Sequence, residues 1–235
     1  MNPDPTTEPA EPGTTGPIRV LIVDDDALVR AALTMMLAGS PDVLLVGEAV
    51  DGRDVPAAVR SHAPDVVLMD IRMPRVDGLT ATELLCREAS PPQIIILTTF
   101  DADEYVLRAV RAGASGFLLK DTPPADLIRA IQLVAAGDAM LSPAVTRKVL
   151  SHVTDSTESS STRRRTRAKR LLADLTERER EVAVAVGQGK SNAEIGTELF
   201  MSVATVKAHV SRLLTKLELN NRVQIALLAH DSDLS

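Results

Sequence analysis

Aromatic residues and cysteine are nearly absent from the sequence. There is no tryptophan, one tyrosine and three phenylalanines, so a hydrophobic content of 45% comes almost wholly from aliphatic side chains. Cys86 stands alone, which excludes an intramolecular disulfide and a metal site built on cysteines. No run reaches the roughly 18 apolar residues of a membrane-spanning helix, and the N-terminus lacks the basic start and apolar stretch of a signal peptide. These absences favour a cytoplasmic protein.

The net charge of −6 hides two regions of opposite sign. Residues 1–162 contain 13 basic and 23 acidic residues, whereas residues 163–235 contain 13 basic and 9 acidic ones. The front is therefore acidic, with a net charge of −10, and the rear is basic, with +4. Such a split indicates two domains with different partners, and the rear one is the candidate for binding a polyanion.

Short apolar runs alternate with amphipathic stretches in the front half. The runs are rich in Val, Ile and Leu, as in strands buried on both faces of a parallel sheet: Ile18–Val23, Val43–Val46, Val66–Met69, Ile94–Leu97 and Phe117–Leu119. Helical patterns follow them at Leu28–Leu37, Asp54–Ser61, Thr80–Glu88, Asp103–Arg111 and Ala125–Ala135. This alternation predicts an α/β fold, a (βα)₅ doubly wound parallel sheet with functional groups at the carboxyl ends of its strands.

The rear half has helical patterns and no strand signal. Helices are expected at Glu177–Gly187, Asn192–Phe200, Val203–Leu217 and Arg222–Ala229, with capping-box patterns at Thr176/Glu179 and Ser191/Glu194 and an N-cap at Ser202. The Ser-, Thr- and Arg-rich segment 151–170 is too polar to fold alone and is typical of a linker. We therefore expect a disordered tail (1–17), a front domain (18–137), a helix and flexible basic linker (138–170) and a small all-α domain (171–235).

Polar side chains follow four of the predicted strands. The first strand is followed by Asp24, Asp25 and Asp26, the third by Asp70, the fourth by Thr98 and Thr99, and the fifth by Lys120. In a parallel sheet these strand ends meet at one edge. Taken singly, each residue has a plainer interpretation, since Asp26 suits the N-cap of the next helix and a lysine beside a strand is usually solvated. The set of four strand ends is more specific than its members.

The chemistry of this set is that of phosphoryl transfer to a carboxylate. Clustered carboxylates repel one another unless a cation neutralises them, and oxygen ligands without His or Cys select a hard divalent ion such as Mg²⁺. A lysine and a hydroxyl beside them can hold phosphoryl oxygens. The implied reaction is attack by an aspartate on phosphorus, which gives an aspartyl phosphate.

The segments VDD, MDIRMPRVDG, LTTF and GASGFLLKD resemble the receiver domain of bacterial response regulators, from Ile18 to about Gly137. The resemblance implies that Asp70 is the phosphoacceptor and that Thr98 and Lys120 contact the phosphoryl group. It implies that Mg²⁺ is bound by Asp25, Asp70 and the backbone carbonyl of Arg72, with Asp24 assisting through water. Pro74 and Gly78 shape the following loop. Thr98 and Phe117 occupy the switch positions; Phe117 lacks the hydroxyl of the tyrosine often found there.

Helix Asn192–Phe200, a short turn and helix Val203–Leu217 form a helix-turn-helix pattern. One arc of the second helix is apolar and is expected to pack inward: Val203, Val206, Val210, Leu213, Leu214 and Leu217. The opposite arc combines small residues with cations, which suits close approach to a major groove. A solvated helix face would have a similar composition, but the neighbouring cations favour DNA.

The segment from Leu175 to His230, above all TVKAHV, resembles the LuxR-type effector domain, and the whole chain is similar to NarL/FixJ-family response regulators. The implied DNA-contacting residues are Thr205, Lys207, Ala208, Ser211, Arg212 and Lys216. The last helix resembles the dimer helix of that family, with Val223, Ala226 and Leu227 at the contact. The implied partners are a sensor histidine kinase, promoter DNA and a second copy of the chain.

Three other functions would account for parts of this sequence. Aspartate-nucleophile phosphatases have a similar pocket but carry an Asp-x-Asp pair, whereas Ile71 and Arg72 follow Asp70 here. A LuxR-type protein that binds a small signal needs an apolar cavity in its front half instead of a carboxylate cluster. DNA binding independent of phosphorylation would leave the acidic cluster without a purpose.

Overall fold

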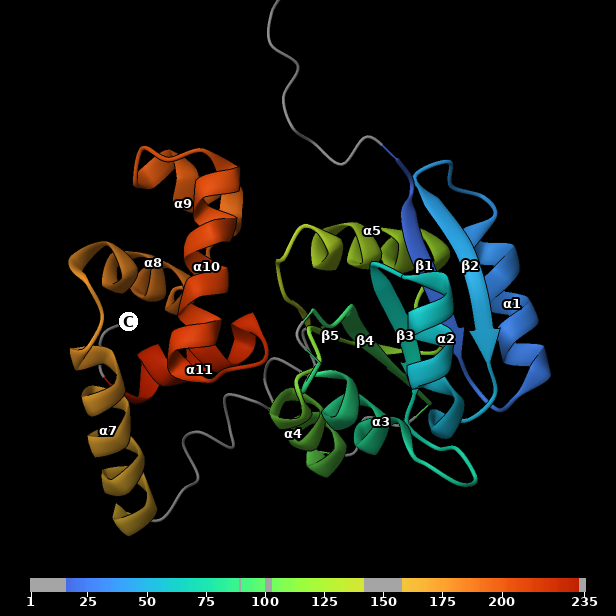
Figure 1. Cartoon of the computed structure of the whole chain (residues 1–235), viewed down its shortest axis with the longest axis horizontal. Coiled ribbons are helices and arrows are strands. Elements are labelled where there is room, and N and C mark those ends of the chain that lie inside the picture. Colours follow the sequence, from blue (N-terminus) through green and yellow to red (C-terminus); the bar gives the residue numbers. More distant parts are fainter. Residues whose placement is uncertain (1–15, 89, 100–102, 142–157, 233–235) are drawn as a thin grey trace, which may run out of the picture.

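The computed structural model describes residues 16–88, 90–99, 103–141 and 158–232 (Figure 1). Its front part contains six strands: β1 (Ile18–Val23), β2 (Val43–Ala49), β3 (Val66–Asp70), β4 (Gln93–Thr98), β5 (Gly116–Leu119) and β6 (Met140–Leu141). The helices of this part are α1 (Ala27–Leu37), the 3₁₀ turn η1 (Gly52–Asp54), α2 (Val55–His62), α3 (Gly78–Leu85), α4 (Asp103–Ala112) and α5 (Pro124–Ala135). The predicted alternation of strands and helices is confirmed.

All strand pairs are parallel, and the strand order is β2-β1-β3-β4-β5-β6. The sequence did not indicate β6, because two residues are too few to show a period. Successive residues of one strand face opposite sides of the sheet. Val20 and Ile22 join one apolar cluster with α1 and α5, whereas Leu21 and Val23 join a second cluster with α2, α3 and α4. Burial on both faces explains why the strands read as continuous apolar runs.

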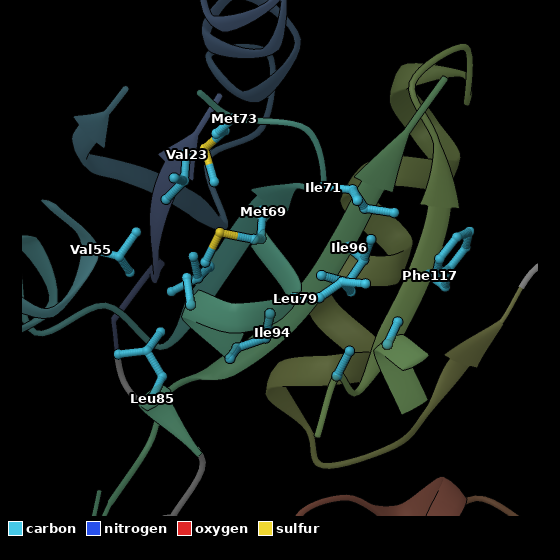
Figure 2. Packing of buried hydrophobic residues seen from close by; sticks show 14 of the residues in the cluster. Val23, Val55, Met69, Ile71, Met73, Leu79, Leu85, Ile94, Ile96 and Phe117 are labelled. Atoms are coloured by element: carbon cyan, nitrogen blue, oxygen red, sulfur yellow. The ribbon is translucent and has the colours of Figure 1, made fainter. Parts of the chain in front are cut away.

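The second cluster packs between one face of the sheet and the helices α2, α3 and α4, and Figure 2 shows part of it. Met69 and Ile96 from the central strands pack there with Leu79 of α3. The ring of Phe117 is 1% exposed and belongs to the same cluster. An aliphatic core of this kind holds the strand ends in a fixed register, and that register positions the site.

The rear part is wholly helical in the residues described: α7 (Glu158–Ala173), α8 (Glu177–Gly187), α9 (Asn192–Glu198), α10 (Val203–Leu217) and α11 (Arg222–Asp231). Both predicted capping boxes are present, at Thr176/Glu179 and Ser191/Glu194, and the Ser202 side chain accepts from the Thr205 N–H at 3.1 Å. These side chains satisfy N–H groups that a helix leaves without partners at its start. Among the helices described, none has the length and apolar character needed to cross a bilayer.

The segment 158–170 is helical, where the sequence indicated a flexible linker. Ala168 and Leu172 of α7 are buried against the rear domain, and α7 packs on α11. Arg167, Lys169 and Arg170 stay exposed on the other side. The composition was misleading because two or three apolar positions on one face are enough to dock a helix. The predicted tail up to residue 15 and linker residues 151–157 lie outside the described residues.

Candidate functional site

The carboxylates of Asp24, Asp25 and Asp70 converge at the carboxyl ends of β1 and β3. Their ligand oxygens lie within 4.8 Å of one another. Asp24 and Asp70 are buried, whereas Asp25 is exposed. Asp26 has a different task, because its side chain accepts from the Leu28 N–H at 2.8 Å and caps α1. The predicted cluster is therefore present, and the capping role of Asp26 is confirmed.

Lys120, which follows β5, is ion-paired with two of these acids. Its Nζ atom lies 2.6 Å from Asp24 Oδ2 and 2.9 Å from Asp70 Oδ1. Burial alone would lower the pKa of Lys120, but hydrogen bonds to the two carboxylates outweigh it and raise that pKa. The ammonium is therefore charged at neutral pH. Thr98 ends β4 beside Lys120, is itself buried, and its carbonyl accepts from the Lys120 N–H at 2.8 Å.

Burial is the main influence on Asp70 and raises its pKa above the ordinary range. Lys120 and the N–H of Arg72 pull the pKa down, whereas the Asp24 carboxylate raises it further. The Arg72 N–H donates to Asp70 Oδ2 at 2.9 Å, which keeps the Arg72 backbone beside the Asp70 carboxylate. A cation placed among these carboxylates would favour their charged forms.

Gly78 is required where the following loop returns to the strand. A Cβ atom at Gly78 would lie 1.8 Å from the backbone oxygen of Asp70, which no side chain can occupy. Its N–H donates to the Ile71 carbonyl at 2.9 Å and closes the loop between them. The expected loop-shaping role of Gly78 therefore has a steric cause.

The cluster fits a hard divalent cation. Its three acids offer only carboxylate oxygens, two of the side chains are buried, and their spacing lets all three reach one ion. Lys120 offsets only part of their charge, since one ammonium faces two of the three acids. With such a cation bound, the positive charges of the ion and of Lys120 could offset the charge of an incoming phosphoryl group.

The predicted DNA-contacting residues are all exposed on α10, but they are not all free: Thr205, Lys207, Ala208, Ser211, Arg212 and Lys216. Lys216 Nζ lies 2.8 Å from Glu179 Oε2. Lys207 and Ser211 line a cavity of about 150 Å³ whose opposite wall includes Gln93 and Ser115 of the front domain. Part of the proposed DNA surface therefore faces the receiver-like domain.

The apolar arc of α10 packs inward as predicted, with one exception. Val206, Val210, Leu213 and Leu217 are buried, but Val203 is 44% exposed. The prediction for Val203 is wrong: this residue is the first of α10, and it lies outside the apolar cluster of the rear domain. The adjoining turn residue Phe200 is 95% exposed.

The predicted dimer residues are divided between two cores of the same chain. Val223 is 7% exposed and packs with Leu227 against the front-domain cluster that includes Val110. Ala226 packs in the rear-domain cluster. The α11 surface expected to meet a second copy is thus covered by the chain's own front domain.

Polar contacts between the two domains had no recognisable signal in the sequence. The Asn221 amide donates to the carbonyls of Val110 and Ala114, both at 2.9 Å, at the end of α4. Gln224 Nε2 donates to the Val110 carbonyl at 2.8 Å. A second contact joins Arg222 to Asp138 at 3.2 Å. In one sequence these polar residues around a helix start resemble ordinary caps, so nothing marked them as docking residues.

Comparisons with known proteins match both halves of the chain. The model of the response regulator receiver domain matches residues 20–132, and that of bacterial regulatory proteins, luxR family, matches residues 173–229. The transcriptional regulatory protein LiaR of Bacillus subtilis is 39% identical over 92% of this chain and 99% of LiaR. The nitrate/nitrite response regulator protein NarL of Escherichia coli is 33% identical over 91% and 95%. The crystal structure of the response regulator ChrA, from a heme-sensing two-component system, has 35% identity and a TM-score of 0.51 over 94% of this chain and 100% of that chain.

Proposed function

This chain belongs to the NarL/FixJ family of two-component response regulators, and on that premise we propose that phosphorylation of Asp70 controls DNA binding by α10. Members of this family regulate transcription and are not enzymes. The observation that carries the proposal is the cluster of Asp24, Asp25 and Asp70 with Lys120 paired to it. A sensor histidine kinase would supply the phosphoryl group, which places the reaction in the cytoplasm.

The residues of the site have separate tasks in this proposal. The Asp70 carboxylate attacks phosphorus, the bond from phosphorus to the donor atom breaks, and the leaving group takes the electron pair. A Mg²⁺ ion held by Asp25, Asp70 and the Arg72 carbonyl, with Asp24 nearby, would supply the charge that offsets the phosphoryl oxygens. Lys120 exchanges its contact with Asp70 for a contact with the new phosphoryl group, and the Thr98 hydroxyl donates to it.

The strand β5 connects this site to the docked effector domain. Lys120 follows the end of β5, and Ala114, whose carbonyl accepts from Asn221, lies just before its start. A pull on Lys120 by the phosphoryl group would therefore disturb the contact made by Asn221. Undocking would remove the front domain from beside Lys207 and Ser211, which leaves room for DNA. It would also expose the Val223 face of α11 to a second copy, so one event favours a DNA-bound homodimer.

Labelling with a small phosphodonor tests the proposal. Asp70→Asn should abolish labelling of the chain by acetyl phosphate in Mg²⁺, because the substituted amide is no nucleophile. Asp121→Asn is the matched control, since it removes an exposed carboxylate next to Lys120. Addition of EDTA should stop labelling of the native chain. Full labelling of Asp70→Asn, or labelling that is unchanged by EDTA, would refute the assignment.

A further inference from the structure

The buried carboxylate of Asp51 accepts more backbone hydrogen bonds than are needed to cap η1. It lies between β2 and η1, is 2% exposed, and accepts three backbone N–H groups: Arg53 at 3.0 Å, Arg75 at 3.0 Å and Val76 at 3.3 Å. The bond from Arg53 caps η1. The other two cross to residues 24 and 25 positions later in the chain. Capping of η1 accounts for only the first of the three bonds.

Those two bonds end on the loop that follows the phosphoacceptor. This loop runs from Ile71 to Asp77, between β3 and α3. Burial alone would raise the pKa of Asp51, but the backbone donors of Arg53, Arg75 and Val76 outweigh it, and the pKa lies below its ordinary value. A charged acceptor makes stronger bonds to N–H groups than a neutral one. Asp51 therefore holds the loop from a separate part of the chain.

A backbone contact beside Asp51 fixes the same loop. The Gly52 N–H donates to the Val76 carbonyl at 3.1 Å, and a Cβ atom at Gly52 would lie only 2.4 Å from that oxygen. The β2–η1 junction and the loop therefore touch backbone to backbone. At its other end, the loop is closed by the bond from Gly78 to Ile71 described above.

Arg72 lies between these two anchors. Its N–H is bonded to Asp70, and its carbonyl is the backbone ligand assigned to the divalent ion under the proposed function. A carbonyl ligand on a loop binds an ion more tightly if the loop already holds it in place, because less conformational freedom is lost on binding. Residues that orient a metal ligand through hydrogen bonds affect affinity without touching the ion.

We propose that Asp51 is a positioning residue for the metal and phosphoryl site, which it serves by holding the loop 71–77 in its ligand-presenting conformation. The proposal rests on the proposed function, because it assigns Asp51 to the same ion. It differs from a purely structural role in one respect. Loss of Asp51 should weaken Mg²⁺ binding even where the fold is retained.

Asp51→Asn is the test variant, since it keeps the size of the side chain and removes its charge and one acceptor. Tyr105 reports on the site because it is the single tyrosine of a chain without tryptophan, and it lines a cavity with Asp25 and Arg72. Mg²⁺ would be titrated against the tyrosine emission of the full chain. We expect Mg²⁺ affinity to fall by about tenfold, as is usual when a residue that orients a ligand is lost.

Asp54→Asn is the matched control. Asp54 ends the same turn, and its carboxylate has a loose surface pairing with Arg53 at 3.9 Å. This variant should bind Mg²⁺ as the native chain does. Labelling of Asp51→Asn by acetyl phosphate should be slow at low Mg²⁺ and recover at saturating Mg²⁺, which a general loss of structure would not produce.

Gly52→Ala provides a second perturbation should Asp51→Asn fold poorly, because its methyl group would press on the Val76 carbonyl and displace the same loop. It should weaken Mg²⁺ binding in the same direction. Unchanged Mg²⁺ affinity in folded Asp51→Asn or Gly52→Ala would overturn the positioning role while leaving the proposed function intact. If the native chain itself gives no response to Mg²⁺ by emission or calorimetry, the metal site of the proposed function is wrong. The role proposed for Asp51 is then wrong as well.

Discussion

Asn221→Asp should release the effector domain without phosphorylation. Asn221 uses its two side-chain ends for different purposes: its Oδ1 atom caps α11 by accepting from the Gln224 N–H at 2.8 Å, and its Nδ2 atom donates to the front domain. Aspartate is an equally good N-cap, so α11 should stay folded. The carboxylate, however, cannot donate to the carbonyls of Val110 and Ala114.

The size of the effect follows from the two lost bonds. Each is buried and 2.9 Å long, and a hydrogen bond of this kind contributes about 1 kcal/mol net, so docking should weaken by at least about 2 kcal/mol. That free energy corresponds to about a thirtyfold change in the docking equilibrium. Repulsion between the carboxylate and the two carbonyl oxygens adds to it. The gain in DNA affinity is limited by the fraction of the native chain that is docked.

The assay is binding of the unphosphorylated full chain to a fluorescent duplex of mixed sequence at low salt. Asn220→Asp is the control, because it introduces the same charge at the neighbouring exposed residue. Asn221→Asp should bind the duplex more tightly than the control and should lose amide protection at the end of α4. Equal affinities of Asn221→Asp, Asn220→Asp and the native chain would refute the role of Asn221 in docking.

Four further outcomes are expected. Lys120→Ala should still be labelled by acetyl phosphate but should gain no DNA affinity on labelling; a normal gain would contradict the link through β5. Glu179→Gln should reduce the acid sensitivity of the rear domain in thermal unfolding across pH. Hydrogen bonds from Lys216 first, and from Thr176, lower the pKa of Glu179 from 4.5 to about 2, so the stabilisation by the charged Glu179 is present above pH 4.5 and is lost as pH falls toward about 2. Lys207→Ala should weaken binding to all duplexes alike and lower the salt slope by about one, whereas a sequence-dependent loss would indicate base contact. Val223→Glu should undock the unphosphorylated chain and also weaken the phosphorylated dimer in sedimentation, because one face serves both contacts; an unaffected dimer would place that interface elsewhere.

The sequence by itself determined the two folds and the acidic cluster. Burial on both faces gives a parallel strand a continuous apolar run, and its carboxyl end is marked by the first polar residue. Asp24, Asp70 and Lys120 could therefore be brought together from their places after the strands. Capping residues such as Thr176 and Ser191 were also recognisable, because a cap is satisfied within three residues of itself.

Tertiary structure decided the contacts between distant segments that no strand end or local pattern marks. The helix α7 exists because Ala168 and Leu172 find a surface to cover, and its polar composition carries no such signal. Asp51 and Asn221 look like ordinary turn and cap residues, since a side chain that bonds a remote backbone carries no local pattern. Val223 was recognised as a contact residue, but an apolar helix face does not specify its partner. The receiver-like domain covers that face because it lies within the same chain, where the local concentration of the two surfaces is high.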